Sequence, residues 1–218
     1  MPTRRLTMSI TGSIIVDIDE EEIIIGGGDP PLADTVWDVT GNPEENVTLS
    51  NGNLTASSVD DAEYGYAVGT RGHDTGKHYF EILAAGTATP DDEEVTLCLV
   101  DDSYDIADGQ NSAHIWRVTS YGFIYHQGDS PVDLGFSVAA GQSFGLWYNA
   151  DTGKIWVGNA ADELSGDPEA GTGESLAITA GTNLRPAVEL YASAPPTAVS
   201  ATLNCEDASG TFAAWNDA

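Results

Sequence analysis

Short stretches in which apolar and polar residues alternate recur along most of this chain, with turn residues between them. The alternation is clear around residue 80, where Phe80 and Ile82 share one face and Glu81 takes the other. Runs of this kind are typical of strands with one buried face. We expect strands at 47–50, 64–69, 78–84, 95–100, 114–118, 122–126, 144–149, 154–158, 186–192 and 199–204.

Helical periodicity is not sustained in any window of the sequence. The 24 glycines and 10 prolines would interrupt a long helix. Between two strand patterns, residues 149–154 read Asn-Ala-Asp-Thr-Gly-Lys, which predicts a tight hairpin with Gly153 at a positive φ. The pattern therefore predicts an all-β chain, with the antiparallel strands of a sandwich or barrel.

Three segments carry a resemblance to a known family. The first runs from 65–68 to Gly-Lys-His-Tyr-Phe-Glu-Ile at 76–82, with Phe80 where tryptophan is usual. The second is Gly-Gln-Ser-Phe-Gly-Leu-Trp-Tyr-Asn at 141–149 followed by 153–159, with Asn149 in place of the usual aspartate. The third is Leu-Arg-Pro-Ala-Val-Glu-Leu at 184–190, followed by 199–205. In this order, over roughly residues 36–206, they resemble the SPRY family.

The SPRY resemblance implies a concanavalin-like jelly roll, a sandwich of two antiparallel sheets whose end loops bind peptides, proteins or sugars. Because ligand residues in this family lie on variable loops, none can be carried over position by position. Similar sandwiches occur in virion proteins of tailed viruses, sometimes behind an N-terminal attachment segment. Together with the N-terminal segment and the acidic composition of this chain, the resemblance suggests a structural protein on the surface of a virion, from a virus of a halophilic host, which adheres to a host surface glycan or glycoprotein or stabilises the particle. The alternative is a cellular carbohydrate- or protein-binding module of a halophile.

The first 31 residues differ from the rest of the chain. Two β-branched runs are followed by a glycine and proline cluster at 26–31, which is typical of a linker. We predict an anchoring arm and linker at 1–31, a sandwich at 32–209 and a C-terminal tail at 210–218. The arm either docks onto a neighbouring chain, giving a homo-oligomer bound to other virion proteins, or packs on its own sandwich. Its contact residues would be Ile14, Ile15, Val16, Ile18, Ile23, Ile24 and Ile25.

The charge balance is strongly acidic, with 35 acidic against 7 basic residues and a net charge of -28. These carboxylates repel one another in dilute buffer, whereas at ~1 M salt the screening length falls to about 3 Å. The acids are spread over the whole chain, which favours a halophilic protein over an ordinary acidic one. Such a surface is repelled by phosphate backbones, so we expect no nucleic-acid partner.

Targeting signals and cysteine chemistry add little. The basic start at 1–5 precedes an apolar run that Asp17 and Asp19 interrupt, so we expect no secretion signal, and no run is long enough for a membrane span. Cys98 and Cys205 lie in apolar strand patterns and read as buried free thiols, with a single disulfide as the alternative.

The strand and turn patterns of the sequence lack the signatures of the common catalytic sites. A glucanase-like enzyme needs carboxylates at alternate positions of one strand, and the acidic run 91–94 lies ahead of its strand instead. The four histidines lack zinc-site spacing, and no nucleophile elbow or phosphate loop occurs. We therefore expect no enzyme, cofactor or metal site, with glycan hydrolysis as a weaker alternative to binding.

The acidic loop 101–111 is the best candidate for a ligand site. Its oxygen atoms suit calcium, but the regular ligand spacing is missing, so a solvated loop is favoured over a metal site. An aromatic ring beside carboxylate and amide groups suits a sugar, whose C–H face stacks while its hydroxyls form hydrogen bonds. The candidate ligand residues are Asp102, Tyr104, Asp108, Asn111 and, on a nearby strand, Tyr125.

Overall fold

The structure is a computed structural model that describes residues 6–9, 13–19, 22–25, 34–40, 46–58, 64–85, 93–126, 129–159, 164, 166–192, 199–207 and 209–217. The chain divides into two compact units, Met1–Asp34 and Thr35–Ala218. The first unit contains one sheet and the second contains two.

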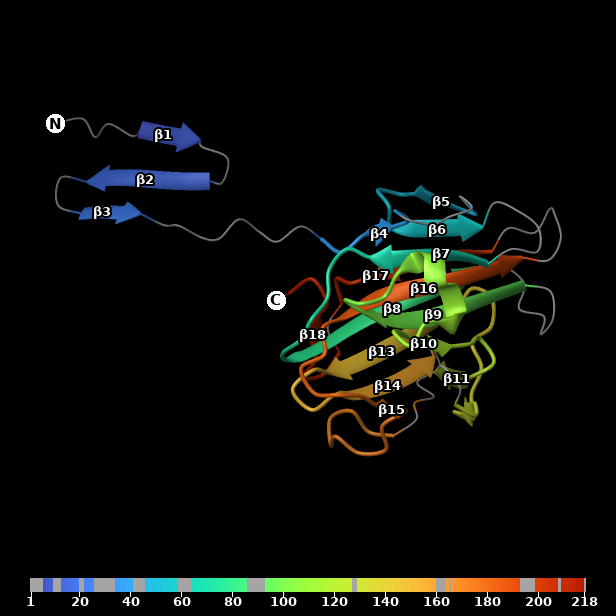
Figure 1. The fold of residues 1–218 in the computed structure, drawn as a ribbon. Helices are drawn as coiled ribbons and strands as arrows, with labels where there is room; N and C mark the ends of the chain where they lie inside the picture. The colour runs from blue at the N-terminus through green and yellow to red at the C-terminus, as the bar shows by residue number, and fades with distance from the viewer. Residues whose placement is uncertain are drawn as a thin grey trace. The chain divides into compact units, whose positions relative to one another are not determined.

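The first unit is a three-stranded antiparallel sheet (Figure 1). It contains β1 (Leu6–Ser9), β2 (Ser13–Asp19) and β3 (Glu22–Ile25), with β2 in the middle. The isoleucine-rich runs of the expected arm lie in β2 and β3, which pair with each other. Their side chains lie outside the described residues, so the docking of this arm onto a neighbouring chain stays a prediction.

The second unit is a sandwich of two sheets (Figure 1). The strands of its seven-stranded sheet are, in spatial order, β12 (Val132–Asp133), β11 (Phe123–His126), β10 (Ile115–Val118), β9 (Glu93–Asp101), β16 (Leu184–Ala192), β7 (Tyr64–Gly69) and β4 (Trp37–Asp38). Every neighbouring pair in this sheet is antiparallel.

The opposite sheet follows the order β15 (Leu176–Ala177), β14 (Lys154–Asn159), β13 (Ser143–Asn149), β8 (Lys77–Ala85), β17 (Ser200–Asn204), β6 (Thr55–Ser58) and β5 (Val47–Ser50). An additional strand, β18 (Ala213–Ala214), pairs with β8 in parallel. The prediction of an all-β, two-sheet antiparallel sandwich is confirmed.

The core lies between the two sheets and follows the alternation of the sequence. Phe80 and Ile82 of β8 are fully buried in it, while Glu81 lies on the other face, half-buried. The hairpin predicted at 149–154 joins β13 to β14, and Gly153 has a φ of 68°. A Cβ at Gly153 would lie 2.2 Å from the Ile178 carbonyl oxygen, so both the conformation and the space require glycine.

The segment after residue 209, expected as a polar tail, packs into the sandwich. Phe212 and Trp215 are fully buried, and the Trp215 Nε1 donates to the Arg71 carbonyl at 3.2 Å. His73 donates from Nε2 to the Trp215 carbonyl at 2.7 Å and stacks on His78 with ring centroids 3.7 Å apart. Burial lowers the pKa of His73 to about 4 and lowers that of His78 as well.

Two further observations concern the cysteines and the helices of the described residues. Cys98 and Cys205 are both buried free thiols. None of the helices among the described residues is long and apolar enough to cross a membrane.

Candidate functional site

The outer face of the seven-stranded sheet carries the candidate site. On β16, Leu184 and Val188 belong to the core between the sheets, so the alternate residues Arg185, Ala187 and Glu189 lie on the outer face. Residues paired across neighbouring strands share a face, so β7, β9 and β10 extend this outer surface on both sides of β16.

A short 3-10 turn, η1 (Ile106–Asn111), covers part of this face. Its entry is capped by Asp105, whose Oδ1 accepts from the Ala107 backbone N–H at 3.0 Å. Tyr104 and Ile106 point inward and belong to a second apolar cluster with Val68 of β7. The loop expected to be solvated is therefore exposed at Asp102, Asp105 and Asp108 but anchored by Tyr104 and Ile106.

A buried polar group lies on the outer face near η1. Glu189 is 1% exposed, forms an ion pair with Arg117 of β10 and accepts from the Tyr66 hydroxyl at 2.7 Å. Burial raises the pKa of Glu189, while the Arg117 guanidinium and the Tyr66 hydroxyl act in the opposite direction. Gln110 of η1 donates its backbone N–H to the Tyr66 oxygen at 3.0 Å. These bonds connect η1 to the sheet and fix its position.

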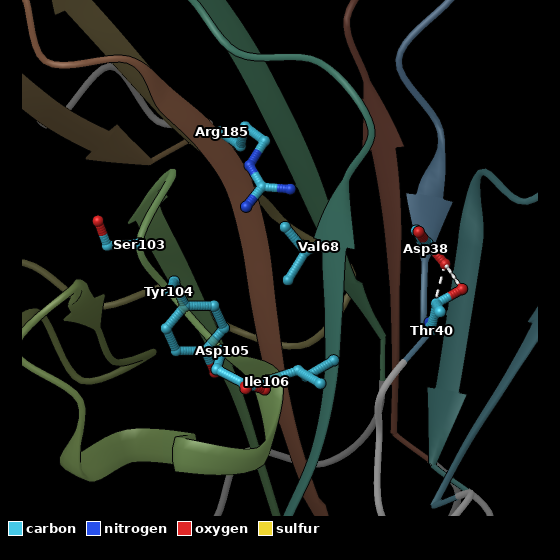
Figure 2. Close-up of a pocket in the computed structure, with 8 residues that line it drawn as sticks. All are labelled: Asp38, Thr40, Val68, Ser103, Tyr104, Asp105, Ile106 and Arg185. Carbon is cyan, nitrogen blue, oxygen red and sulfur yellow. Dashed lines mark hydrogen bonds between the residues drawn. The ribbon is translucent and has the colours of Figure 1, made fainter.

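The first of two pockets beside η1 has a volume of about 370 Å³ (Figure 2). Its lining residues are Asp38, Thr40, Val68, Ser103, Tyr104, Asp105, Ile106 and Arg185. The Asp38 Oδ1 accepts from the Thr40 hydroxyl at 2.6 Å and from its backbone N–H at 2.8 Å. These bonds lower the pKa of Asp38, so the pocket holds an ionised carboxylate.

The second pocket, of about 190 Å³, adjoins the other end of η1. The Arg117 guanidinium carbon lies 5.9 Å from the centre of the Tyr125 ring, within reach of a cation–π contact. His126 donates from Nε2 to the Ala113 carbonyl at 3.1 Å. The lining residues are Gln110, Asn111, Ile115, Arg117, Tyr125, His126 and Asp129.

The five candidate ligand residues from the sequence separate into three groups. Tyr104 lines the first pocket, although it is only 8% exposed, so its ring cannot offer an open stacking face. Asn111 and Tyr125 line the second pocket. Asp102 is exposed and accepts from the Asn183 amide at 3.0 Å, and Asp108 is exposed on η1; neither lines these pockets.

Sequence reasoning missed Asp38 and Arg185 of the first pocket and Arg117 of the second. Arg185 lies in a strand whose apolar neighbours indicated only packing, and Asp38 lies far from the acidic loop in sequence. The signal that was available is the scarcity of basic residues, because each of the 7 stands out against 35 acids. Arg117 and Arg185 could have been singled out on that ground.

In the described part of the chain, no three His, Cys, Asp or Glu side chains lie close enough together to hold a metal ion. The pockets instead combine guanidinium, carboxylate, hydroxyl and apolar groups. Such groups bind through hydrogen bonds and charge, and they suit polar ligands of small to moderate size.

Comparison with solved structures identifies proteins with a similar fold. No protein-family model and no curated protein matches the chain. Among solved structures, the SPRY domain of human HERC1 has a TM-score of 0.58 at 16% identity, covering 76% of this chain and 96% of its own. This chain has the SPRY fold. The TRIM65 PSpry domain is also similar to this chain, with a TM-score of 0.53 at 13% identity, covering 78% of this chain and 92% of its own.

A human SPRY domain is also similar, with a TM-score of 0.51, 17% identity and coverage of 72% and 95%. At these identities the likeness establishes the SPRY fold and leaves the ligand to be argued from the site.

Proposed function

We propose that this chain is a non-enzymatic binding module, which recognises a protein or carbohydrate on the outer face around η1. The observation that carries the proposal is the pair of pockets flanking η1, which are lined by residues of the loop around η1 and of strands on either side of β9 and β16. The hydrogen bonds of Tyr66 and Asp105 hold η1 in place before any ligand binds, which lowers the ordering cost of binding. The SPRY fold supports a binding role by analogy.

A more specific role follows from the unit that precedes the sandwich. We propose that the sheet β1–β3 anchors the chain to other virion proteins of a tailed virus of a halophilic host. The sandwich would then be displayed on the particle, as a capsid decoration, spike or tail component, for host adhesion or particle stabilisation. The division into two compact units and the net charge of -28 support this arrangement.

Ligand binding is tested with the full chain on an array of glycans and host surface proteins at ~2 M salt. We expect binding that Tyr125→Ala weakens, because Tyr125 lines the second pocket. The matched control is Tyr64→Ala, which removes a tyrosine of 38% exposure that stacks on Tyr191 and lines neither pocket. Equal loss in both variants would contradict the placement of the site. Release of sugar product from a polysaccharide would contradict the non-enzymatic role.

The anchor is tested by light scattering at ~2 M salt, where charge repulsion is screened. The full chain is compared with a chain that begins at Leu32, since the sandwich has its own core. We expect an oligomer that becomes monomeric on truncation. Monomers in both samples would contradict the anchor and favour a cellular binding module.

A further inference from the structure

Among the described residues of the sandwich, Arg185 differs from the other basic side chains because it forms no hydrogen bond or ion pair. The unit 35–218 has five such side chains, and four of them contact a carbonyl, hydroxyl or carboxylate oxygen: Arg71, Lys77, Arg117 and Lys154. The Arg185 Nε is buried, and among the described residues it has neither a hydrogen-bond acceptor nor an ion pair.

The lack of a direct partner is unexpected in a chain with 35 acidic residues, although Arg185 attracts Asp38 at longer range and contributes to the lowered pKa of that carboxyl. Two carboxylates, Asp38 and Asp105, line the same pocket as Arg185. One oxygen of each is already bound locally, by Thr40 and by the Ala107 backbone, and neither forms an ion pair with the guanidinium. The Nε is buried, so a ligand in the pocket would meet the two terminal nitrogens of the guanidinium, whose charge no carboxylate among the described residues neutralises by direct contact.

Figure 2 shows the Arg185 guanidinium extending from β16 toward Val68 and Tyr104 inside the first pocket. A guanidinium presents parallel N–H groups that match the two oxygens of a carboxylate. The two aspartates nearby disfavour a ligand of higher negative charge, because each added charge would be repelled by them. The aspartates repel every anion, and more strongly the higher its charge, so the anion best tolerated beside Arg185 carries a single carboxylate.

We propose that the first pocket binds an acidic sugar, with the sugar carboxylate on Arg185. Apart from Arg185, the polar lining consists of carboxylates and hydroxyls, which accept hydrogen bonds from the O–H groups of a sugar ring. Val68 and Ile106 supply an apolar wall for its C–H groups. A peptide offers fewer O–H donors, and the volume of about 370 Å³ lies within the roughly 300–1,000 Å³ range of small-molecule sites. This inference rests on the proposed binding function and names its ligand class.

The test is a titration of the full chain with methyl glucuronide at ~0.15 M salt, followed through the arginine Nε–H signals in a ¹H–¹⁵N NMR spectrum. The Arg185 signal is assigned by its loss in Arg185→Gln. We expect the glucuronide to shift the Arg185 signal. In Arg185→Gln, where this signal is absent, binding is measured from the backbone signals of the pocket residues, and we expect it to be weaker by at least about tenfold. Asp38→Asn should not weaken binding, because an amide oxygen still accepts a hydroxyl and the repulsion of the sugar carboxylate by one aspartate is removed.

Two controls separate a specific site from general charge. Lys154→Gln removes one positive charge on β14, where Lys154 pairs with Glu174, and should leave binding unchanged. Methyl glucoside, which lacks the carboxylate, should bind at least about tenfold more weakly than the glucuronide. Equal binding of the two sugars, or equal affinity in Arg185→Gln and the unchanged chain, would overturn the proposal.

A third probe distinguishes the sugar from a peptide. The tripeptide Gly-Glu-Gly, blocked at both ends, also presents one carboxylate, and we expect it to bind more weakly than the glucuronide. If only the peptide shifts the Arg185 signal, the acidic-sugar assignment is wrong although the binding function stands. If no probe shifts the Arg185 signal while a ligand from the array still binds in a manner that Tyr125→Ala weakens, the acidic-sugar proposal is wrong but the binding function stands. If neither pocket binds a ligand, the proposed binding function is wrong as well.

Discussion

Replacing Trp215 by alanine should destabilise the sandwich more than any surface tryptophan replacement. Trp215 is fully buried, and its ring meets Phe80 edge-on with centroids 4.9 Å apart. The variant also removes the Nε1 donor to the Arg71 carbonyl, a bond that ties the C-terminal segment to the loop after β7. The prediction therefore tests whether residues after 209 belong to the core.

The magnitude follows from cavity formation. Truncating a buried tryptophan to alanine costs about 3–5 kcal/mol, because surrounding atoms fill the space only in part. A domain of this size commonly has an unfolding free energy of about 5–15 kcal/mol. Each kcal/mol lowers Tm by about 2–4 °C in a chain of 150–250 residues, so we expect a fall of about 6–20 °C.

The measurement is urea unfolding followed by far-UV circular dichroism at ~2 M salt, which avoids tryptophan fluorescence. The matched control is Trp116→Ala, because Trp116 is only half-buried at the edge of the same core. We expect the control to lose roughly half as much free energy as Trp215→Ala. A loss below about 1 kcal/mol, or one no larger than the control, would refute the placement of Trp215 in the core.

Four further outcomes are expected from urea or thermal unfolding. Glu189→Ala should cost about 3–5 kcal/mol, because it leaves Arg117 without its buried carboxylate; a loss under 1 kcal/mol would contradict this. The pKa of His73 is lowered to about 4 in the folded chain. The contribution of its neutral ring to the free energy of unfolding is therefore fully present above about pH 6.5 and is lost as the pH falls toward 4. The advantage of the unchanged chain over His73→Asn should therefore shrink, by on the order of 2 kcal/mol, between pH 7 and pH 4. Raising salt from ~0.1 M to ~2 M should raise Tm, because screening weakens the repulsion of a net charge of -28; an unchanged Tm would argue against halophily. Gly122→Ala should cost more than about 1 kcal/mol, since φ is 78° and a Cβ would lie 1.8 Å from the Phe136 carbonyl oxygen.

The strands of the core were predictable because their pattern is local. A residue on a strand faces the side opposite to its neighbours, so the order Phe80, Glu81, Ile82 already states which two residues are buried. The hairpin at 149–154 was predictable for a related reason, since its turn residues and Gly153 act within a few positions of the sequence.

The candidate site was only partly predictable. Loop 101–111 was found from its acidic and aromatic residues, and Tyr104, Asn111 and Tyr125 do line the pockets beside it. The sequence could not tell that Tyr104 turns inward while Asp102 and Asp108 face solvent, because a loop has no repeating face.

By itself the sequence determined the fold class, the main strands, the acidic charge and the separate character of the first residues. Only the tertiary structure decided which side chains from distant parts of the sequence lie together on each face of the sheets. Arg185 lies with Tyr104 in one pocket, Glu189 pairs with Arg117 at a separation of 72 residues, and Trp215 packs against Phe80. The physical reason is that alternation fixes the faces of one strand, whereas strand order and register bring distant side chains together.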